Sequence, residues 1–102
     1  MEITATPQKI TLDEIREDLK QIRFYYAHKD LFTNDFKENS VIEKVRKYNQ
    51  VVNTAPARLL ALYISLYANN ATQEAVAHDM GYSTRYIQMQ HKKLLEYLQS
   101  KL

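Results

Sequence analysis

Residues 72–98, TQEAVAHDMGYSTRYIQMQHKKLLEYL, decide the predicted fold and contain Gly81, the single glycine of a 102-residue chain. A residue just past a helix end often takes a positive φ, which glycine adopts at no steric cost. Thr72 and Ser83 stand on either side of Gly81, each where an N-cap residue is favoured. The stretch therefore predicts two helices that meet at a tight turn, with the second continuing through residue 98.

The residues around Gly81 are small or apolar at regular intervals. The positions concerned are Val76, Ala77, Met80, Tyr82 and Ile87. The alanine would let the second helix approach, Val76 and Met80 would supply apolar contacts, Tyr82 would plug the interface after the turn, and Ile87 would anchor the second helix. This combination is typical of helix-turn-helix pairs of the DNA-binding kind.

A helical wheel separates two faces of the second helix. The inward side collects Ser83, Ile87, Leu94 and Leu98, with His91 beside them. The outward side carries Arg85, Gln88, Met89, Lys92 and Glu96. A duplex would therefore meet the first turns of the outward side.

Several residues of these first turns have the chemistry to read DNA. Arg85 can pair bidentately with guanine, Gln88 can pair bidentately with adenine, and Met89 can contact a thymine methyl group. Thr84 can reach a base edge or a phosphate. The residues better suited to phosphate contacts are Thr72, Gln73, Ser83, Lys92 and Lys93.

The charge of the chain is unevenly distributed. Residues 1–53 carry nine Lys/Arg and nine Asp/Glu, within a chain whose formal net charge is +2 at pH 7. From Tyr82 onward, four Lys/Arg stand against one Asp/Glu, a net charge of +3. The positive excess on the last helix favours a polyanionic partner.

Composition argues against several classes of protein. The chain has no cysteine, which excludes disulfides, thiolate nucleophiles and Cys-based zinc sites. His28, His78 and His91 lack the spacing of a metal site, so no metal or cofactor is expected. The sequence contains neither a nucleophile elbow nor a phosphate-cradling glycine loop, and we expect no catalytic site. It also lacks a bilayer-spanning apolar run and a signal peptide, which predicts a cytoplasmic protein that does not bind a membrane.

The first half of the chain predicts two amphipathic helices. Residues 1–10 show no sustained period and are expected to form a flexible tail. Residues 11–14 (TLDE) and 40–43 (SVIE) each match a capping box. The apolar stripes that follow are Ile15, Leu19, Ile22 and Tyr26 in the first case and Val41, Val45, Tyr48 and Val52 in the second. The first helix can extend to the breaker cluster at residues 33–35, and the second can instead start at Asn34 or Asp35.

A third predicted helix is the most apolar part of the chain. Pro56 suits its first turn, where the missing N–H costs nothing. One face is lined by Leu59, Leu62, Tyr63, Leu66 and Tyr67, flanked by Leu60 and Ile64. We expect this segment to be the central core helix and to end at Asn69 and Asn70.

These elements together predict a single all-α domain of four to five helices. Residues 54–102 would form a trihelical unit that ends in the helix-turn-helix. Residues 11–53 would form a helical part that either packs on this unit or serves as an oligomerisation arm.

The residues of the helix-turn-helix also carry a family resemblance. TQEAVAHDMGYS followed by TRYIQMQHKKLLEYL resembles region 4 of sigma-70-type factors, whose helix-turn-helix reads the promoter −35 element. With NTAPARLLALYISLY before it, the pattern is similar to the ArpU/RinA-type transcriptional regulators of phages and prophages in Gram-positive bacteria. The chain departs from the sigma pattern in two places: Gln90 stands where an apolar residue is usual, and Met89 where a basic residue is common.

The resemblance implies a transcriptional regulator that binds promoter DNA and engages host RNA polymerase. A homodimer would read half-sites about one helical turn apart, whereas a monomer beside polymerase would read a single −35-like element. The alternative hypothesis is a helical protein-interaction module that docks on RNA polymerase, a sigma factor or a phage assembly component without reading bases. The balanced charge and the tyrosine-rich helices of the first half favour this alternative.

Overall fold

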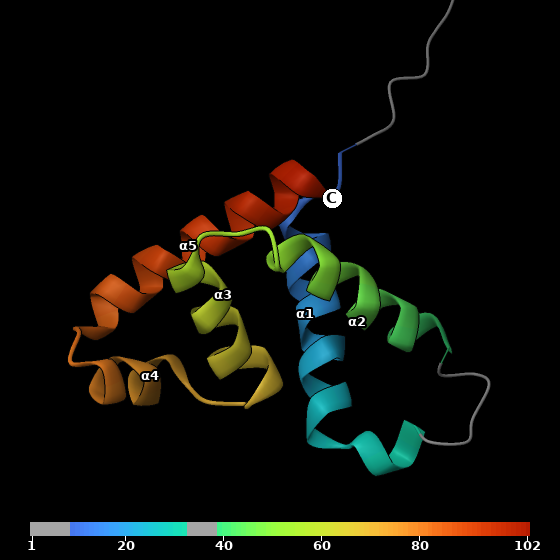
Figure 1. Ribbon diagram of the computed structural model, residues 1–102, viewed down its shortest axis with the longest axis horizontal. Coiled ribbons are helices and arrows are strands. Elements are labelled where there is room, and N and C mark those ends of the chain that lie inside the picture. The colour runs from blue at the N-terminus through green and yellow to red at the C-terminus, as the bar shows by residue number, and fades with distance from the viewer. Residues whose placement is uncertain (1–8, 33–38) are drawn as a thin grey trace, which may run out of the picture.

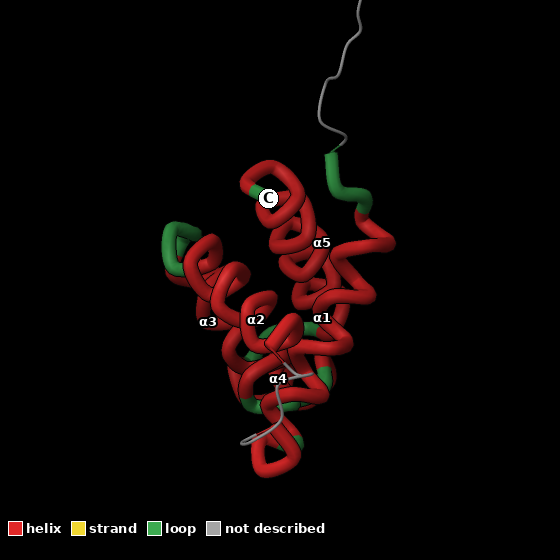
Figure 2. Tube along the Cα trace, turned by 90° about the vertical axis from the view of Figure 1, so that its right-hand side faces the viewer, coloured by secondary structure: helices red, strands yellow, loops and turns green. Residues whose placement is uncertain are grey.

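The computed structural model describes residues 9–32 and 39–102, and all regular structure in these ranges is helical (Figures 1 and 2). The five α-helices are α1 (Leu12–Ala27), α2 (Asn39–Val52), α3 (Ala57–Tyr63), α4 (Gln73–Met80) and α5 (Thr84–Lys101). A 3₁₀ turn, η1 (Lys29–Phe32), follows α1, and a π-helical segment, η3 (Ile64–Ala68), extends α3. The predicted all-α fold is confirmed for the described residues. Of the tail expected at residues 1–10, only Lys9 and Ile10 lie within them.

The start of α1 is set by the predicted capping box. The Glu14 N–H donates to the Thr11 hydroxyl oxygen at 3.1 Å, and the Thr11 N–H donates to the Glu14 carboxylate at 2.8 Å. Two otherwise unpaired N–H groups of the first turn are satisfied in this way. The helix ends at Ala27, with His28 as its C-cap, before the breaker cluster at residues 33–35 is reached.

The second capping box does not act as one. Because α2 already includes Asn39, Ser40 lies inside the first turn instead of at the N-cap, and that prediction is wrong. An N-cap residue needs an extended backbone, which a position within the helix does not have. The alternative start at Asn34 or Asp35 lies outside the described residues.

The apolar third helix is central, as predicted. Leu59, Leu62, Tyr63 and Leu66 are buried, whereas Ile64 is exposed. Pro56 is the N-cap of α3, one position before the first turn in which the sequence placed it. Its carbonyl oxygen accepts hydrogen bonds from the N–H groups of Leu59 and Leu60.

The larger of two cores joins the first half of the chain to the last helix. Its buried members are Ile15, Leu19, Ile22, Val45, Tyr48, Val52, Leu59, Tyr63, Leu94, Leu95 and Leu98. Helices α1 and α2 thus pack on α5. Asp18 supports the α1–α2 contact, since its carboxylate accepts a hydrogen bond from the Tyr48 hydroxyl at 2.7 Å and pairs with Lys44 at 3.0 Å.

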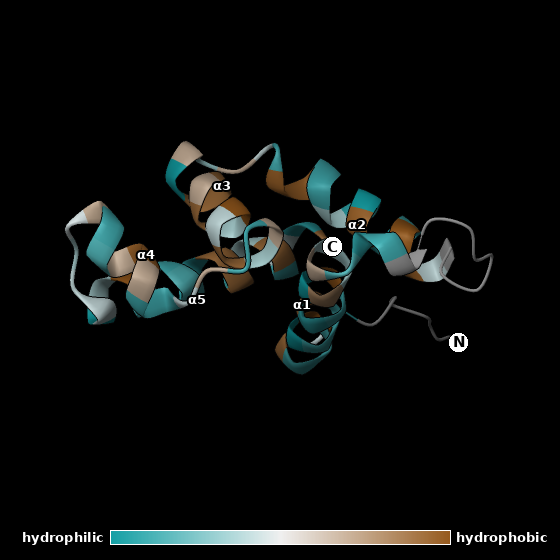
Figure 3. Cartoon of the chain, turned by 90° about the horizontal axis from the view of Figure 1, so that it is seen from below, coloured by the Kyte–Doolittle hydropathy of each residue, from teal (hydrophilic) through white to brown (hydrophobic). Residues whose placement is uncertain are grey.

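The smaller core holds α4 against α5 and η3. It contains Leu62, Leu66, Val76, Ala77 and Ile87. Figure 1 shows α4 beneath the start of α5, at the opposite end of the molecule from α2. Figure 3 shows brown and teal segments within the same helices, as expected for helices that bury one side and expose the other.

A polar clamp ties α1 to the loop that leads into α4. The Arg23 guanidinium donates to the carbonyl oxygens of Asn70 and Ala71, each at 3.2 Å. The Asn70 amide donates back to the Arg23 carbonyl oxygen at 3.4 Å. Asn70 has a φ of 59°, in the left-handed region that costs energy for a residue other than glycine. The clamp therefore holds this turn, and with it the start of α4, against the N-terminal half.

None of the helices within the described ranges is both long and apolar enough to cross a lipid bilayer.

Gln90 is the one buried polar residue that the structure describes. Its side chain lies in the inward face of α5 with an exposed fraction of 7%, at the position where the sigma pattern has an apolar residue. The side-chain oxygen has no hydrogen-bond partner among the described residues. A buried acceptor without a partner retains its desolvation penalty, so Gln90 weakens the interior.

We predict that Gln90→Met, which keeps the length of the side chain and removes the unpaired acceptor, raises the free energy of unfolding by about 1 kcal/mol. Thermal or urea unfolding measures the change. The same substitution at exposed Gln50 is the control and should leave the stability nearly unchanged. Equal effects at the two positions would show that the buried oxygen carries no penalty.

Candidate nucleic-acid interface

The turn between α4 and α5 contains Gly81, which has a left-handed backbone conformation. Gly81 closes α4 with φ 74° and ψ 26°. Its N–H donates to the His78 carbonyl oxygen, and the Tyr82 N–H donates to the Ala77 carbonyl oxygen at 2.9 Å. These bonds satisfy carbonyl groups that the helix end leaves free. The predicted glycine turn is confirmed.

Both helices of the pair start with the predicted cap. The Thr72 hydroxyl oxygen accepts from the Ala75 N–H at 3.0 Å, and the Ser83 hydroxyl oxygen accepts from the Tyr86 N–H at 3.1 Å. Each cap satisfies one N–H, so others in the first turn of α4 and of α5 remain directed outward. Such N–H groups are suited to anionic oxygens.

Two of the apolar residues expected to lock the pair are instead on the surface. Val76, Ala77 and Ile87 are buried as predicted, but the exposed fractions of Met80 and Tyr82 are 44% and 52%. Met80 is the last residue of the eight-residue α4, and the Tyr82 ring contacts the Tyr86 ring at 4.5 Å between centroids instead of entering the core. The predictions for Met80 and Tyr82 are therefore wrong.

The outward face of α5 is exposed as the wheel predicted. Its residues are Arg85, Gln88, Met89, Lys92 and Glu96. Among the neighbouring residues with a predicted DNA contact, Thr72, Ser83 and Lys93 are exposed, and Thr84 and Gln73 are partly buried. Inward, Ile87, Leu94 and Leu98 are buried as expected, whereas the small Ser83 is exposed at the cap.

The basic and amide side chains of this face have no partners among residues 9–32 and 39–102. Arg85, Gln88 and Lys92 make no hydrogen bond or ion pair with any residue that the structure describes, and the same holds for Lys93. By contrast, Lys44 and Arg23 in the first half of the chain are held by internal partners. The outward face of α5 thus presents donors and positive charge that are free to bind a ligand.

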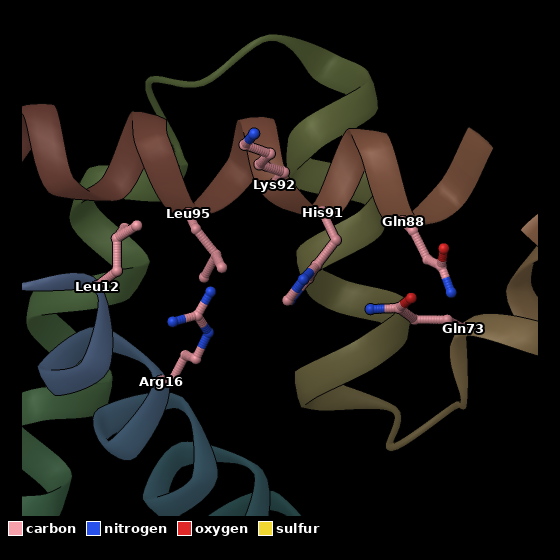
Figure 4. Close-up of a pocket in the computed structure, with 7 residues that line it drawn as sticks. All are labelled: Leu12, Arg16, Gln73, Gln88, His91, Lys92 and Leu95. Atoms are coloured by element: carbon pink, nitrogen blue, oxygen red, sulfur yellow. The ribbon is translucent and has the colours of Figure 1, made fainter. Parts of the chain in front are cut away.

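A pocket of about 280 Å³ extends from this face to α1. It is lined by Leu12, Arg16, Gln73, Gln88, His91, Lys92 and Leu95. Figure 4 shows the Gln73 side chain extending into the pocket toward His91, the Gln88 side chain descending from α5 beside Gln73, and Arg16 reaching from α1 toward Leu95. The structure therefore brings Gln73, Gln88 and Lys92 to one place, while Arg85, Met89 and Lys93 lie outside the pocket. Sequence reasoning did not include Arg16.

His91 lies at the back of this pocket and is hydrogen-bonded through Nε2 to the Tyr67 hydroxyl. Burial, assisted by the positive charge of Arg16, lowers the pKa of His91 below its ordinary value. Burial also raises the pKa of Tyr67 to about 12. Both rings are thus neutral at neutral pH, and the contact joins η3 to α5.

The histidines do not form a metal site within the described part of the chain, where no three His, Asp or Glu side chains are grouped as a metal ion would require.

Comparison of the chain with protein-family models, with curated proteins and with solved structures finds no match. A function is therefore inferred from the residues and geometry of the chain itself.

The lowered pKa of His91 predicts how stability depends on pH. Because the folded state resists protonation of this ring, the unfolded state binds more protons at acidic pH, and stability falls as the pH drops through about 6.5. We expect His91→Gln to reduce the loss of stability between about pH 7 and pH 5, measured by urea unfolding at both values. The exposed His78→Gln is the control. If both variants lose as much stability as the wild type, His91 does not contribute to the acid sensitivity.

Proposed function

We propose that the chain is a sequence-specific DNA-binding transcriptional regulator that reads double-stranded DNA with the outward face of α5. The observation that carries this proposal is the set of exposed, unpartnered side chains on that face, Arg85, Gln88 and Lys92. An arginine and a glutamine one turn apart beside a capped turn are the residue types that can pair bidentately with guanine and adenine.

The position of these residues along α5 suits the major groove. An α-helix fits into this groove, and in helix-turn-helix proteins the first turns of the second helix contact the bases. Arg85 and Gln88 occupy the first two turns and Met89 lies beside them, with an exposed fraction of 53%. Lys92 and Lys93 come one turn later, where the side chains of an inserted helix approach the phosphates.

The start of α4 would bind the backbone on the same side. The Thr72 cap leaves N–H groups of Gln73 and Glu74 without a helical partner, and the Gln73 side chain lies beside that of Gln88 at one end of the pocket. A strand that borders the groove read by α5 would pass this helix end. Phosphate contacts would supply most of the affinity, and Arg85 with Gln88 most of the base discrimination.

The resemblance to sigma region 4 and to ArpU/RinA-type regulators makes the proposal more specific. It favours a phage- or prophage-encoded protein of the bacterial cytoplasm that acts at promoters with host RNA polymerase. The capped α4, the glycine turn and the buried Ile87 support the helix-turn-helix on which this resemblance rests. A homodimer on two half-sites and a monomer beside polymerase are both compatible with it.

A second candidate function is a protein-docking module without base readout. It is favoured by the exposed apolar side chains near the turn, Met80, Tyr82 and Met89. Large exposed apolar residues at one end of a molecule are typical of an interface with another protein. A gel shift with mixed duplexes at low and physiological salt separates the two functions, because a docking module would show no salt-sensitive retardation.

We predict that Arg85→Ala weakens binding to a preferred duplex by about 1–3 kcal/mol. The variant should also show a smaller difference in affinity between the preferred duplex and duplexes of other sequence. The reason is the loss of a bidentate contact between Arg85 and a base that only the preferred sequence has at that position. Fluorescence anisotropy with preferred and scrambled duplexes measures both quantities. Unchanged preference in the variant would mean that Arg85 does not read a base.

For Lys92→Ala we predict a loss of affinity that is similar for all duplexes. The slope of log K against log salt should become shallower by about 0.9, the value for one phosphate contact. The control is Lys47→Ala on α2, which removes the same charge from an exposed lysine that lines a pocket with Leu102, beyond the far end of α5. If the two variants weaken binding equally, net charge rather than the α5 face determines affinity.

A further inference from the structure

The pocket between α1, α4 and α5 continues the outward face of α5. Two of its lining residues, Gln88 and Lys92, also belong to that face, while Arg16 is contributed by the N-terminal half. The pocket opens to solvent and has no carboxylate among the seven lining residues. A ligand that bound the outward face would therefore pass directly over it.

Arg16 is directed across this pocket. Figure 4 shows its guanidinium directly beneath Leu95 and on the side of His91. Its positive charge adds to the effect of burial in lowering the pKa of His91, and it offsets a small part of the rise that burial causes in the pKa of Tyr67. Among the described residues its ion-pair partner is Asp13 at 3.2 Å, and the side chains of Arg16 and Asp13 are 55% and 95% exposed, respectively. Such a solvent-exposed pair is worth little and engages one of the five N–H donors of the guanidinium. The remaining donors are available to a ligand.

The other polar groups of the pocket also suit an anion. Gln73 and Gln88 each carry an amide NH₂ group, and neither side chain is hydrogen-bonded to a described residue. Gln73 is in addition the first residue of α4, where free N–H groups favour negative charge. The Arg16 guanidinium, the Gln73 amide and the free N–H groups at the start of α4 surround a pocket without a carboxylate, and they match a group that has several acceptor oxygens and a negative charge.

We propose that this pocket binds a phosphate of the DNA backbone and that Arg16 is its principal cation. The proposal rests on the proposed function, since it takes the duplex read by α5 as the source of the phosphate. The DNA strand that borders the groove occupied by the start of α5 runs past Gln88 and Lys92, and Arg16 meets it from the other side. The N-terminal half then takes part in binding DNA as well as in holding α5.

The chain offers a closely matched control for Arg16. Lys20 is a second cation of α1 that is paired with an acidic residue three positions earlier, Glu17, in the same way as Arg16 is paired with Asp13. Both pairs are exposed, but Lys20 does not line the pocket. Arg16→Ala and Lys20→Ala each remove one positive charge and break an exposed ion pair within α1. The two variants differ only in whether the lost charge lined the pocket.

The test measures the affinity of the full chain for a duplex of mixed sequence at several salt concentrations. We expect Arg16→Ala to weaken binding about 10-fold and to reduce the slope of log K against log salt by about 0.9. Arg16→Gln, which keeps a polar side chain, should show the same reduced slope, and Lys20→Ala should behave as the wild type. Circular dichroism confirms that each variant is folded.

The results separate this proposal from the proposed function. If the wild type binds duplex and Arg16→Ala has the same affinity and slope as Lys20→Ala, the phosphate site is wrong while DNA binding stands. If the wild type binds no duplex at any salt concentration, the proposed function fails and this proposal fails with it. Inorganic phosphate is tested separately: if it raises the thermal stability of the wild type only and Arg16→Ala leaves duplex affinity unchanged, the pocket binds a free anion instead.

Discussion

The position of α5 depends on burying one face of this 18-residue helix in two cores at once. Near its start, Ile87 packs with Val76 and Ala77 of α4 in the smaller core. Two turns later, Leu94 and Leu98 pack in the larger core with α1, α2 and α3. Because a continuous helix cannot rotate in one core without rotating in the other, both cores together determine which side chains face outward. Exposure of Arg85 at one end thus depends on burial of Leu98 at the other.

The N-terminal half therefore contributes to the proposed interface from a distance. The Arg23 clamp on Asn70 and Ala71 fixes the turn before α4, and α1 supports the C-terminal half of α5 through the larger core. Rigid placement of this kind is what base readout requires, since a bidentate pair tolerates little movement. The proposed role of Arg16 extends the same arrangement, because a helix that supports α5 also reaches the surface on which a phosphate would lie.

Most features that depend on a few neighbouring residues could be predicted from the sequence, although the capping box expected at residues 40–43 was wrong, and features that depend on how helices cross could not. The caps at Thr11 and Thr72, like the left-handed turn at Gly81, arise from local hydrogen bonds and backbone sterics. The wheel predicted the exposed side of α5 for the same reason. Gln90 lies three residues after Ile87, at a position where the sigma pattern has an apolar residue, so its burial had a signal in the sequence. The approach of Arg16 to His91 depends on the packing of helices far apart in the chain, which periodicity does not encode. The signal available for Arg16 was its place beside the apolar stripe of α1.

The central claim is that the start of α5 reads bases, and selection of bound sequences from a random duplex library tests it most directly. If Arg85 and Gln88 contact neighbouring base pairs, the recovered sequences share a short motif in which a guanine and an adenine lie close together. The form of the motif, a palindrome or a single element, also distinguishes a dimer from a monomer. A pool that remains random after repeated rounds, although the protein retains duplex at low salt, would contradict base reading.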